Sequence, residues 1–294
     1  MNKFQNLAIE PIYDPYDLSL TVKFLRIKFL SSYKWAYELF NHVLLMNKKY
    51  DLYGFKLMQG KKLRGAILSI YQGKYSDDAN KVFDVINTVC WCVDKELKGL
   101  PALMLLKHQA DFHKDSIITS YTIGNLEALN IHYKLGYKNM STQFTRYYPI
   151  NPTILMLDNL KIFQIQANEI PLEKNFIIKI EDQKDLEYFK FEIKKNKHIH
   201  FIGIKKIKFL KKIPIPHFLV LWTSDDFSFL LYKDQIWKYF FKRNNCLFLD
   251  FYQKSLTHDI ESNKSRKKFL IKSPCNINFY PPLGGELSIK EIMH

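Results

Sequence analysis

The spacing of hydrophobic residues changes repeatedly over the first 148 residues, between the spacing of a helix and that of a strand. This pattern constrains the fold of the chain more than any other feature of the sequence. Apolar residues recur every three or four positions through 20–30 and 35–40, which predicts two helices with a break near Ser31-Ser32. Beyond residue 53, extended and helical segments alternate. The predicted order is helix, helix, three strands, helix, strand, helix, strand, and this order indicates a mixed α/β (α+β) domain.

Turn residues bound the later elements of that domain. A hairpin is predicted over 53–71 around a turn at 59–62, and a long strand over 82–93, because Val, Ile, Thr and Trp favour extended backbone. The remaining predictions are a helix at 102–108, a strand at 116–121, a helix at 125–135 that Gly136 ends, and a strand at 137–148.

The length of 294 residues favours two domains, since domains hold about 100 to 200 residues. Pro149 and Pro152 interrupt helical and strand hydrogen bonding, so we expect domains at 1–148 and 153–294. The second half is predicted to form another α/β unit, a degenerate repeat of the first. Its predicted elements are strands at 176–180, 200–209, 217–222 and 247–252, helices at 183–194 and 230–243, and a polar loop at 255–268.

Composition places the chain among ordinary globular proteins. Apolar residues make up 47% and charged residues 25%, and no apolar run reaches the roughly 18 residues of a membrane span. The N-terminus lacks a signal-peptide pattern, and four scattered cysteines form no disulfide framework. These features predict a cytoplasmic protein.

The net charge of +15 makes an anionic partner plausible without naming it. Lysines are densest in 194–212, where they either follow a phosphate backbone or protect a sheet edge. No nucleic-acid module accompanies them, and both halves carry the charge excess, so we do not expect nucleic acid as the partner. His198 and His200 share one face of a strand, but a third metal ligand is missing, and we expect no metal.

Two segments, 89–103 and 125–137, resemble the GNAT superfamily of acyl-CoA-dependent N-acyltransferases. In that family a strand leads through a glycine turn into a helix, as around Gly99, and a later helix ends in a Leu-Gly-aromatic sequence, here Leu135-Gly136-Tyr137. The resemblance covers residues 50–145. It implies a mixed sheet flanked by helices and the transfer of an acyl group, acetyl above all, from acyl-CoA to a small-molecule amine, with an amino sugar as one candidate.

The expected coenzyme site has a physical basis. Unpaired N–H groups and the positive dipole end at a helix start receive a pyrophosphate, and an exposed strand edge pairs with pantetheine amides. The resemblance implies that Asn125, at the start of the later helix, caps this helix and touches the cofactor, although capping alone would explain an asparagine there. The candidate cofactor-binding residues are Cys92, Val93, Lys98, Gly99, Leu100, Ala102 and Asn125.

Two positions depart from the family pattern. Glu96 stands where a basic residue is expected, and Pro101, which has no N–H, stands where a second small residue is expected. These departures favour the alternative of a non-catalytic binding or scaffold protein that kept the fold.

The resemblance also supplies the candidate catalytic residues. Family members commonly place a Tyr four residues before the last glycine, where it protonates the departing thiolate; that position is His132 here, with Tyr133 beside it. Histidine can donate a proton near neutral pH. No general base is predicted, and neither Cys90 nor Cys92 has a neighbouring base that would make it a nucleophile.

Overall fold

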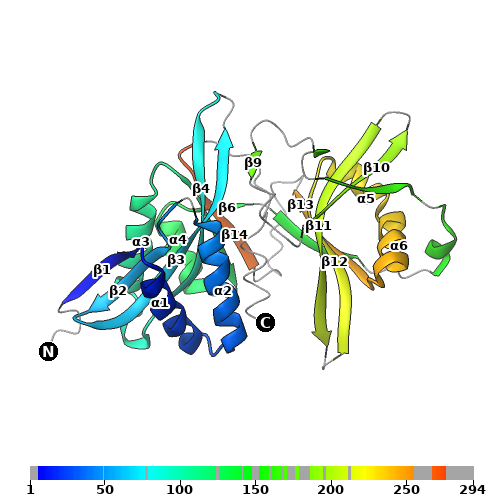
Figure 1. Cartoon of the computed structure of the whole chain (residues 1–294). Coiled ribbons are helices and arrows are strands. Elements are labelled where there is room, and N and C mark those ends of the chain that lie inside the picture. Colours follow the sequence, from blue (N-terminus) through cyan, green and yellow to red (C-terminus); the bar gives the residue numbers. More distant parts are fainter. Residues whose placement is uncertain are drawn as a thin grey trace.

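Two mixed β-sheets with helices packed against them make up the described part of the chain (Figure 1). The coordinates are a computed structural model. It describes residues 6–48, 50–76, 79–123, 126–140, 142–147, 152–158, 160–166, 169–170, 176–178, 186–194, 197–210, 213–254 and 267–275.

The first sheet has the strand order β1-β2-β3-β4-β5-β14-β6, and β9 pairs with β3 beside this path. All neighbouring pairs are antiparallel except β4 and β5, which run parallel. The strands are β1 (Leu7–Ile12), β2 (Gly54–Gln59), β3 (Lys62–Ser76), β4 (Val82–Val93), β5 (Ile117–Ile123), β6 (Lys138–Met140), β9 (Phe176–Ile178) and β14 (Lys267–Lys272).

The described helices that flank this sheet are α1 (Pro15–Lys28), α2 (Tyr33–Met46), α3 (Leu100–Phe112) and α4 (Leu126–Lys134). The predicted break between the first two helices is confirmed, since Ser32 caps α2 by accepting a hydrogen bond from the Trp35 N–H. Successive residues of β3 face opposite ways: Leu68 packs with α1 and α2, and Ile67 with α3. The sheet therefore has a helical layer on each face.

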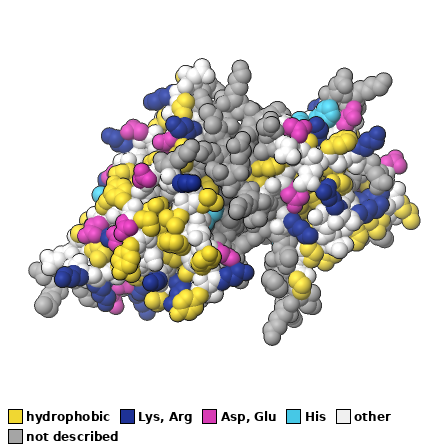
Figure 2. All heavy atoms as spheres, in the orientation of Figure 1, with side chains coloured by type: hydrophobic (Ala, Val, Ile, Leu, Met, Phe, Trp, Pro, Cys, Tyr) yellow, Lys and Arg dark blue, Asp and Glu magenta, His cyan; other side chains and the backbone are white. Residues whose placement is uncertain are grey.

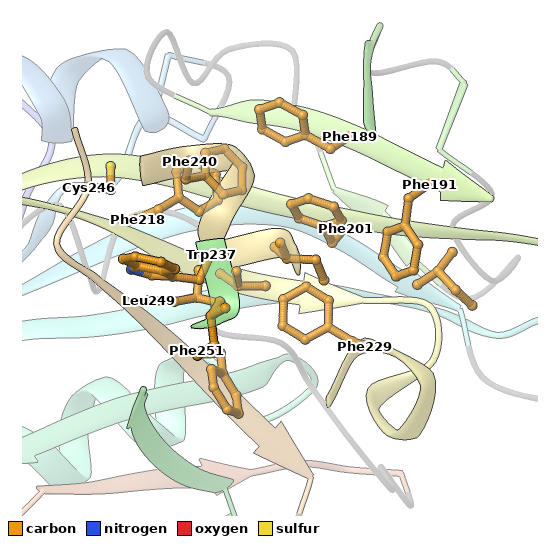
Figure 3. Packing of buried hydrophobic residues seen from close by; sticks show 14 residues of the cluster. Phe189, Phe191, Phe201, Phe218, Phe229, Trp237, Phe240, Cys246, Leu249 and Phe251 are labelled. Atoms are coloured by element: carbon orange, nitrogen blue, oxygen red, sulfur yellow. The ribbon is translucent and has the colours of Figure 1, made fainter. Parts of the chain in front are cut away.

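The second sheet has the order β7-β13-β12-β11-β10-β8, with β12 and β13 parallel. Its core is dominated by phenylalanine, with Phe189, Phe201 and Phe218 packed under α6 (Figure 3). The elements are β7 (Thr142–Tyr147), β8 (Ile162–Ile165), β10 (Glu187–Lys194), β11 (Lys197–Leu210), β12 (Ile213–Thr223), β13 (Phe248–Lys254), the helices α5 (Asp226–Leu231) and α6 (Lys233–Asn244), and the 3-10 turn η2 (Pro152–Met156).

One element has a different type from the one its sequence predicts. The helix expected at 183–194 is the strand β10, which pairs with both β8 and β11. Phe189 and Phe191 are fully buried on one face while Lys190 lies between them on the other. Neighbouring strands therefore override the helical composition of this segment. The loop predicted at 255–268 lies outside the described residues apart from the start of β14.

The two sheets exchange strands across the boundary expected between residues 148 and 153. The predicted strand at 137–148 is two strands, β6 in the first sheet and β7 in the second. In return, β9 and β14 come from the second half and pair in the first sheet. The division into domains 1–148 and 153–294 stays a prediction. Among the described helices, none has the length and apolar character needed to cross a bilayer.

Candidate functional site

The parallel pair β4 and β5 separates partway along its length. Its ladder runs from Val85 opposite Ile117 to Thr88 opposite Ser120, although β4 continues to Val93 and β5 to Ile123. Among the described strands, the last part of β4 therefore pairs with β3 alone, on the side away from β5. An opening between two strands leaves backbone N–H and C=O groups available to a ligand.

A β-bulge lies where the strands part. Val89 pairs with Leu68 and Cys92 with Ala66, so two residues of β4, Cys90 and Trp91, stand opposite one residue of β3. Cys90 has a positive φ of 54°, which is uncommon for a residue with a side chain. A bulge bends its strand and increases the local twist. The bulge thus turns the end of β4 away from β5.

The cysteines of β4 are not set up as nucleophiles. Burial raises the pKa of Cys90 to about 12, and burial also raises the pKa of Cys92. Only the thiolate attacks, so both groups are held in the unreactive form near neutral pH. The backbone of Cys92 and Val93 pairs with β3 and lies beyond the end of the β4–β5 ladder, at the edge of the opening.

A cluster of charges fixes the turn that follows β4. Arg64, at the start of β3, contacts Asp94 through Nη1 at 2.8 Å and Glu96 through Nη2 at 2.6 Å, and Lys28 at the end of α1 also contacts Asp94. The Asp94 N–H donates to the Arg64 carbonyl at 2.7 Å. Arg64 therefore neutralises Glu96, the acidic residue that departs from the family pattern. Sequence reasoning did not identify Arg64, which lies 30 residues before Asp94.

Beyond the 3-10 turn η1 (Lys95–Leu97), Gly99 caps α3 with φ +93° and ψ −122°. An added Cβ would meet nothing within 4 Å, so the glycine is needed for its backbone conformation and not for space. Lys98, Gly99 and Leu100 are exposed, while Ala102 is buried. The first N–H groups of α3 have no intrahelical acceptor, and Pro101 contributes none.

His132 lies on α4, buried beside the end of β4. Its ring packs edge-on against Trp91 at 5.6 Å and against Tyr137 at 4.9 Å between centroids. His132 Nδ1 lies 2.7 Å from the Ala128 carbonyl oxygen. A carbonyl only accepts, so Nδ1 carries the hydrogen and Nε2 presents a lone pair. That Nε2 is buried and has no hydrogen-bond partner among the residues that the structure describes. Burial lowers the pKa of His132, which keeps the ring neutral near pH 7.

Two more site residues, Tyr133 and Asn125, were predicted on this helix. Tyr133 is 42% exposed on the outer side of α4, and Asn125 lies outside the described residues. Gly136, with φ +83°, ends the helix as predicted, and the Tyr137 N–H donates to the His132 carbonyl at 3.1 Å. The structure therefore brings His132, but not Tyr133, to the end of β4.

A buried chain of polar side chains starts at Thr88, the last residue of β4 that pairs with β5. The Thr88 hydroxyl donates to Gln109 Oε1 at 3.0 Å, and Gln109 Nε2 donates to the Ser69 hydroxyl at 2.8 Å. That hydroxyl lies 3.5 Å from His113 Nε2, whose Nδ1 lies 3.1 Å from the Tyr50 hydroxyl. This chain ties α3 to the point where the strands part. Sequence reasoning missed it, because its members are up to 63 residues apart.

Other features lie apart from this opening. The rings of His198 and His200, the pair considered as metal ligands, are 6.4 Å apart, and the described residues contain no group of three or more His, Cys, Asp or Glu that could hold a metal ion. An open pocket of about 320 Å³ lies against α6 in the second sheet's unit and is lined by Leu160, Gln235, Tyr239, Lys242 and Arg243.

Solved structures share this arrangement of sheets and helices. A GCN5-related N-acetyltransferase from Anabaena variabilis matches with a TM-score of 0.55 at 9% identity, over 90% of this chain and 72% of its own. The chain has the fold of the GCN5-related N-acetyltransferases. A second one, from Kribbella flavida, matches with a TM-score of 0.52 at 9% identity, over 90% of this chain and 71% of its own. A conserved protein of unknown function from Enterococcus faecalis reaches 0.57 at 7% identity, over 91% and 72%.

This GNAT fold confirms the resemblance found in segments 89–103 and 125–137, and the mixed α/β class with it. The matches cover 90–91% of the chain, so they extend over strands of both sheets. At identities below a tenth they establish the fold alone. No protein-family model and no curated protein sequence matches the chain. That the second half is a degenerate repeat of the first stays a prediction.

Proposed function

We propose that this protein transfers an acyl group from acyl-coenzyme A to an amine of a small molecule. The observation that carries the proposal is the opening between β4 and β5, at whose end the capped helix α3 begins. Beside this opening lies the buried Nε2 of His132, for which the described part of the chain supplies no hydrogen-bond partner. Acetyl-CoA is the proposed donor and an amino sugar a candidate acceptor. We place the reaction in the cytoplasm, where the four free cysteines stay reduced.

The pantetheine amides and the pyrophosphate of the donor each match one part of the opening. Backbone groups of Cys92 and Val93 would pair with the pantetheine amides, as an added strand does. The exposed turn at Lys98 and Gly99 and the first N–H groups of α3, those of Leu100 and Ala102 included, would hold the pyrophosphate. Asn125, as the expected cap of α4, is proposed as a further contact.

The proposed proton path uses His132. A neutral amine attacks the thioester carbonyl, and the new C–N bond leaves an extra proton on the amine nitrogen. Neutral His132 Nε2 takes this proton as the C–S bond breaks, and the imidazolium then gives it to the departing thiolate. A lowered pKa makes the imidazolium a stronger acid than a free one, which suits the second step.

The rival proposal is a binding or scaffold protein that kept the fold without the reaction. Pro101 favours it, because a buried proline in the first turn of α3 removes one N–H from the anion site. Glu96 favours it less, since Arg64 already contacts this carboxylate.

Thermal unfolding with acetyl-CoA tests the coenzyme assignment. A ligand at about 100 times its dissociation constant stabilises the folded state by about 2.7 kcal/mol. We expect Lys98→Glu to weaken acetyl-CoA binding by about tenfold, because it places a negative charge beside the pyrophosphate. Lys114→Glu makes the same charge change beyond the other end of α3 and should leave binding unchanged. No shift with acyl-CoA, or a shift with oligonucleotides alone, would overturn the coenzyme assignment.

Turnover then tests the proton path. His132→Gln should keep acetyl-CoA binding but lower kcat by about a hundredfold, because general acid–base catalysis contributes factors of this size. Tyr133→Phe alters the exposed neighbour on the same helix and should leave kcat unchanged. Binding without turnover in the unaltered protein, across a panel of amines, would support the rival. Full turnover in His132→Gln would remove this residue from the mechanism.

A further inference from the structure

Large apolar side chains cover the outer side of the helical hairpin formed by α1 and α2. We call this surface the hairpin face and define it by the exposed residues Tyr16, Leu20, Ile27, Leu30, Tyr33 and Tyr37. Figure 2 shows hydrophobic side chains gathered over this part of the first sheet's unit, with Lys and Arg among them. Scattered apolar residues are normal on a protein surface, but a contiguous set marks a contact surface.

Four exposed residues of α1 form one stripe. Tyr16, Leu20, Lys23 and Ile27 follow one another at spacings of four, three and four, which places them along one side of the helix. The opposite side packs on the sheet through residues such as Leu18. The helix therefore has apolar residues both on the side that packs against the sheet and on the side that is exposed. Only the first of these sides contributes to the core.

The turn between the helices holds a leucine outward in an unfavourable conformation. Leu30 is 93% exposed and has φ 52°, a region that residues with branched or bulky side chains rarely adopt. Backbone hydrogen bonds fix this turn, from Leu30 N to the Ile27 carbonyl and from Ser31 N to the Arg26 carbonyl. An ordered turn that exposes leucine at its tip, next to the exposed Ile27 and Tyr33, is a structured apolar projection.

The charges on the hairpin face are basic. Lys23 is exposed on the α1 stripe, and the Arg26 guanidinium lies 3.9 Å from the centre of the Tyr33 ring. The acidic residues of the hairpin are engaged locally: Asp14 caps α1, Asp17 contacts Lys56 at 2.7 Å, and Glu38 contacts Lys34 at 3.8 Å. The face therefore offers apolar contact and positive charge to a partner.

We propose that the hairpin face binds an anionic lipid surface. Tyrosine and lysine both place an apolar body in the lipid and a polar tip among the headgroups. Leu30 and Ile27 then enter the acyl boundary, while Lys23 and Arg26 face the anionic headgroups. This inference goes beyond the proposed acyl transfer and does not depend on it.

A second copy of the chain suits this face less well. In a two-fold symmetric dimer the same patch forms both sides, so Lys23 and Arg26 would approach their own counterparts. The acidic residues of the hairpin are already engaged, and interface cores are depleted in lysine. A lipid surface with anionic headgroups supplies the missing negative charge.

Vesicle sedimentation with the full chain tests this proposal. We expect binding to vesicles of phosphatidylcholine and phosphatidylglycerol, and weak binding to phosphatidylcholine alone. Leu30→Asp should lower the partition coefficient by about tenfold or more, because burying a leucine contributes a factor of this size. Aspartate tolerates the left-handed conformation, so this variant keeps the fold. Met156→Asp makes a comparable change at a residue that is 86% exposed in η2, and it should bind like the unaltered protein.

Two charge-reversal variants complete the test. Lys23→Glu should weaken binding to the anionic vesicles, and Lys242→Glu, which makes the same change on α6, should weaken it less. Three results would overturn the proposal: no binding to anionic vesicles, equal losses in Leu30→Asp and Met156→Asp, or a dimer in sedimentation velocity that Leu30→Asp dissociates. The last result would assign the face to a second copy of the chain. Acetyl-CoA binding, measured on the same variants, is expected to stay unchanged.

Discussion

Buried histidine side chains are expected to make the stability of this protein depend on pH. Burial lowers the pKa of His42 and of His113 to about 4, and it lowers the pKa of His132. An imidazole at a buried site stays neutral and acts as a hydrogen-bonding group, as His113 does between Ser69 and Tyr50. These groups take up protons in the unfolded chain at a pH at which the folded chain leaves them neutral.

The sign of the resulting pH dependence follows from linkage. Between the folded pKa of about 4 and the ordinary value of 6.5, the unfolded chain binds more protons, so the free energy of unfolding falls as the pH falls. The contribution of His113 is complete above pH 6.5 and decreases by about 2 kcal/mol on reaching about pH 5. We expect His113→Gln to flatten this slope in urea unfolding, whereas His108→Gln, at an exposed position of α3, leaves it unchanged. Equal slopes in both variants would show that His113 titrates normally.

A glycine in β11, Gly203, determines how the strands β11 and β12 pack against α6. The register between these strands shifts at Gly203, where an added Cβ would lie 2.2 Å from Phe218 Cε1. Phe218 stacks on Phe240 of α6 at 3.8 Å between centroids (Figure 3). The glycine therefore leaves the space in which Phe218 meets the helix.

Gly203→Ala is expected to destabilise the protein by about 1–3 kcal/mol, because the methyl group displaces Phe218 from this stack. Urea unfolding measures the loss, and tryptophan fluorescence reports it, since Trp237 lies in the same core. Gly60→Ala serves as the comparison: Gly60 has φ +58° but no atom within 4 Å of an added Cβ, so only about 1 kcal/mol of backbone strain is expected. Equal losses in the two variants would contradict the packing argument.

Strand exchange joins the two halves of the protein. β14 lies between β5 and β6, pairing with both, and Leu270 of β14 is buried with Ala110, Ile118 and Tyr137. The sheet that carries the candidate site is thus completed by a segment more than 120 residues downstream of β6. Such pairing joins segments far apart in the sequence, so the stability of the first sheet depends on β14, a strand from the second half of the chain.

Leu270→Ala tests this dependence. We expect a loss of about 2–5 kcal/mol, as for other buried leucine truncations, with weaker hydrogen-exchange protection in β5 and β6. Leu247→Ala removes the same atoms at a residue that is 48% exposed and should leave protection unchanged. Unaltered protection of β5 in Leu270→Ala would mean that β14 is not part of the stable sheet.

Much of the first sheet and its helices could be predicted from local signals. Ser32 caps α2, Gly99 and Gly136 end or begin helices, and the spacing of apolar residues separates strands from helices. These are interactions within a few residues, so the sequence carries them directly. The same signals located the turn at Lys98 and the helix of His132.

Contacts between distant segments were not predictable in this way. Arg64 meets Glu96, Gln109 meets Ser69, and β14 enters the first sheet because the folded chain brings them together, and no spacing in the sequence marks these pairs. The segment of β10 shows the same limit, since its strand form depends on the neighbours β8 and β11. Local hydrogen bonding and apolar periodicity thus dictate most helices and strands of the first sheet's unit, while the pairing of strands far apart along the chain decides the form of β10 and how the elements assemble around the opening beside His132.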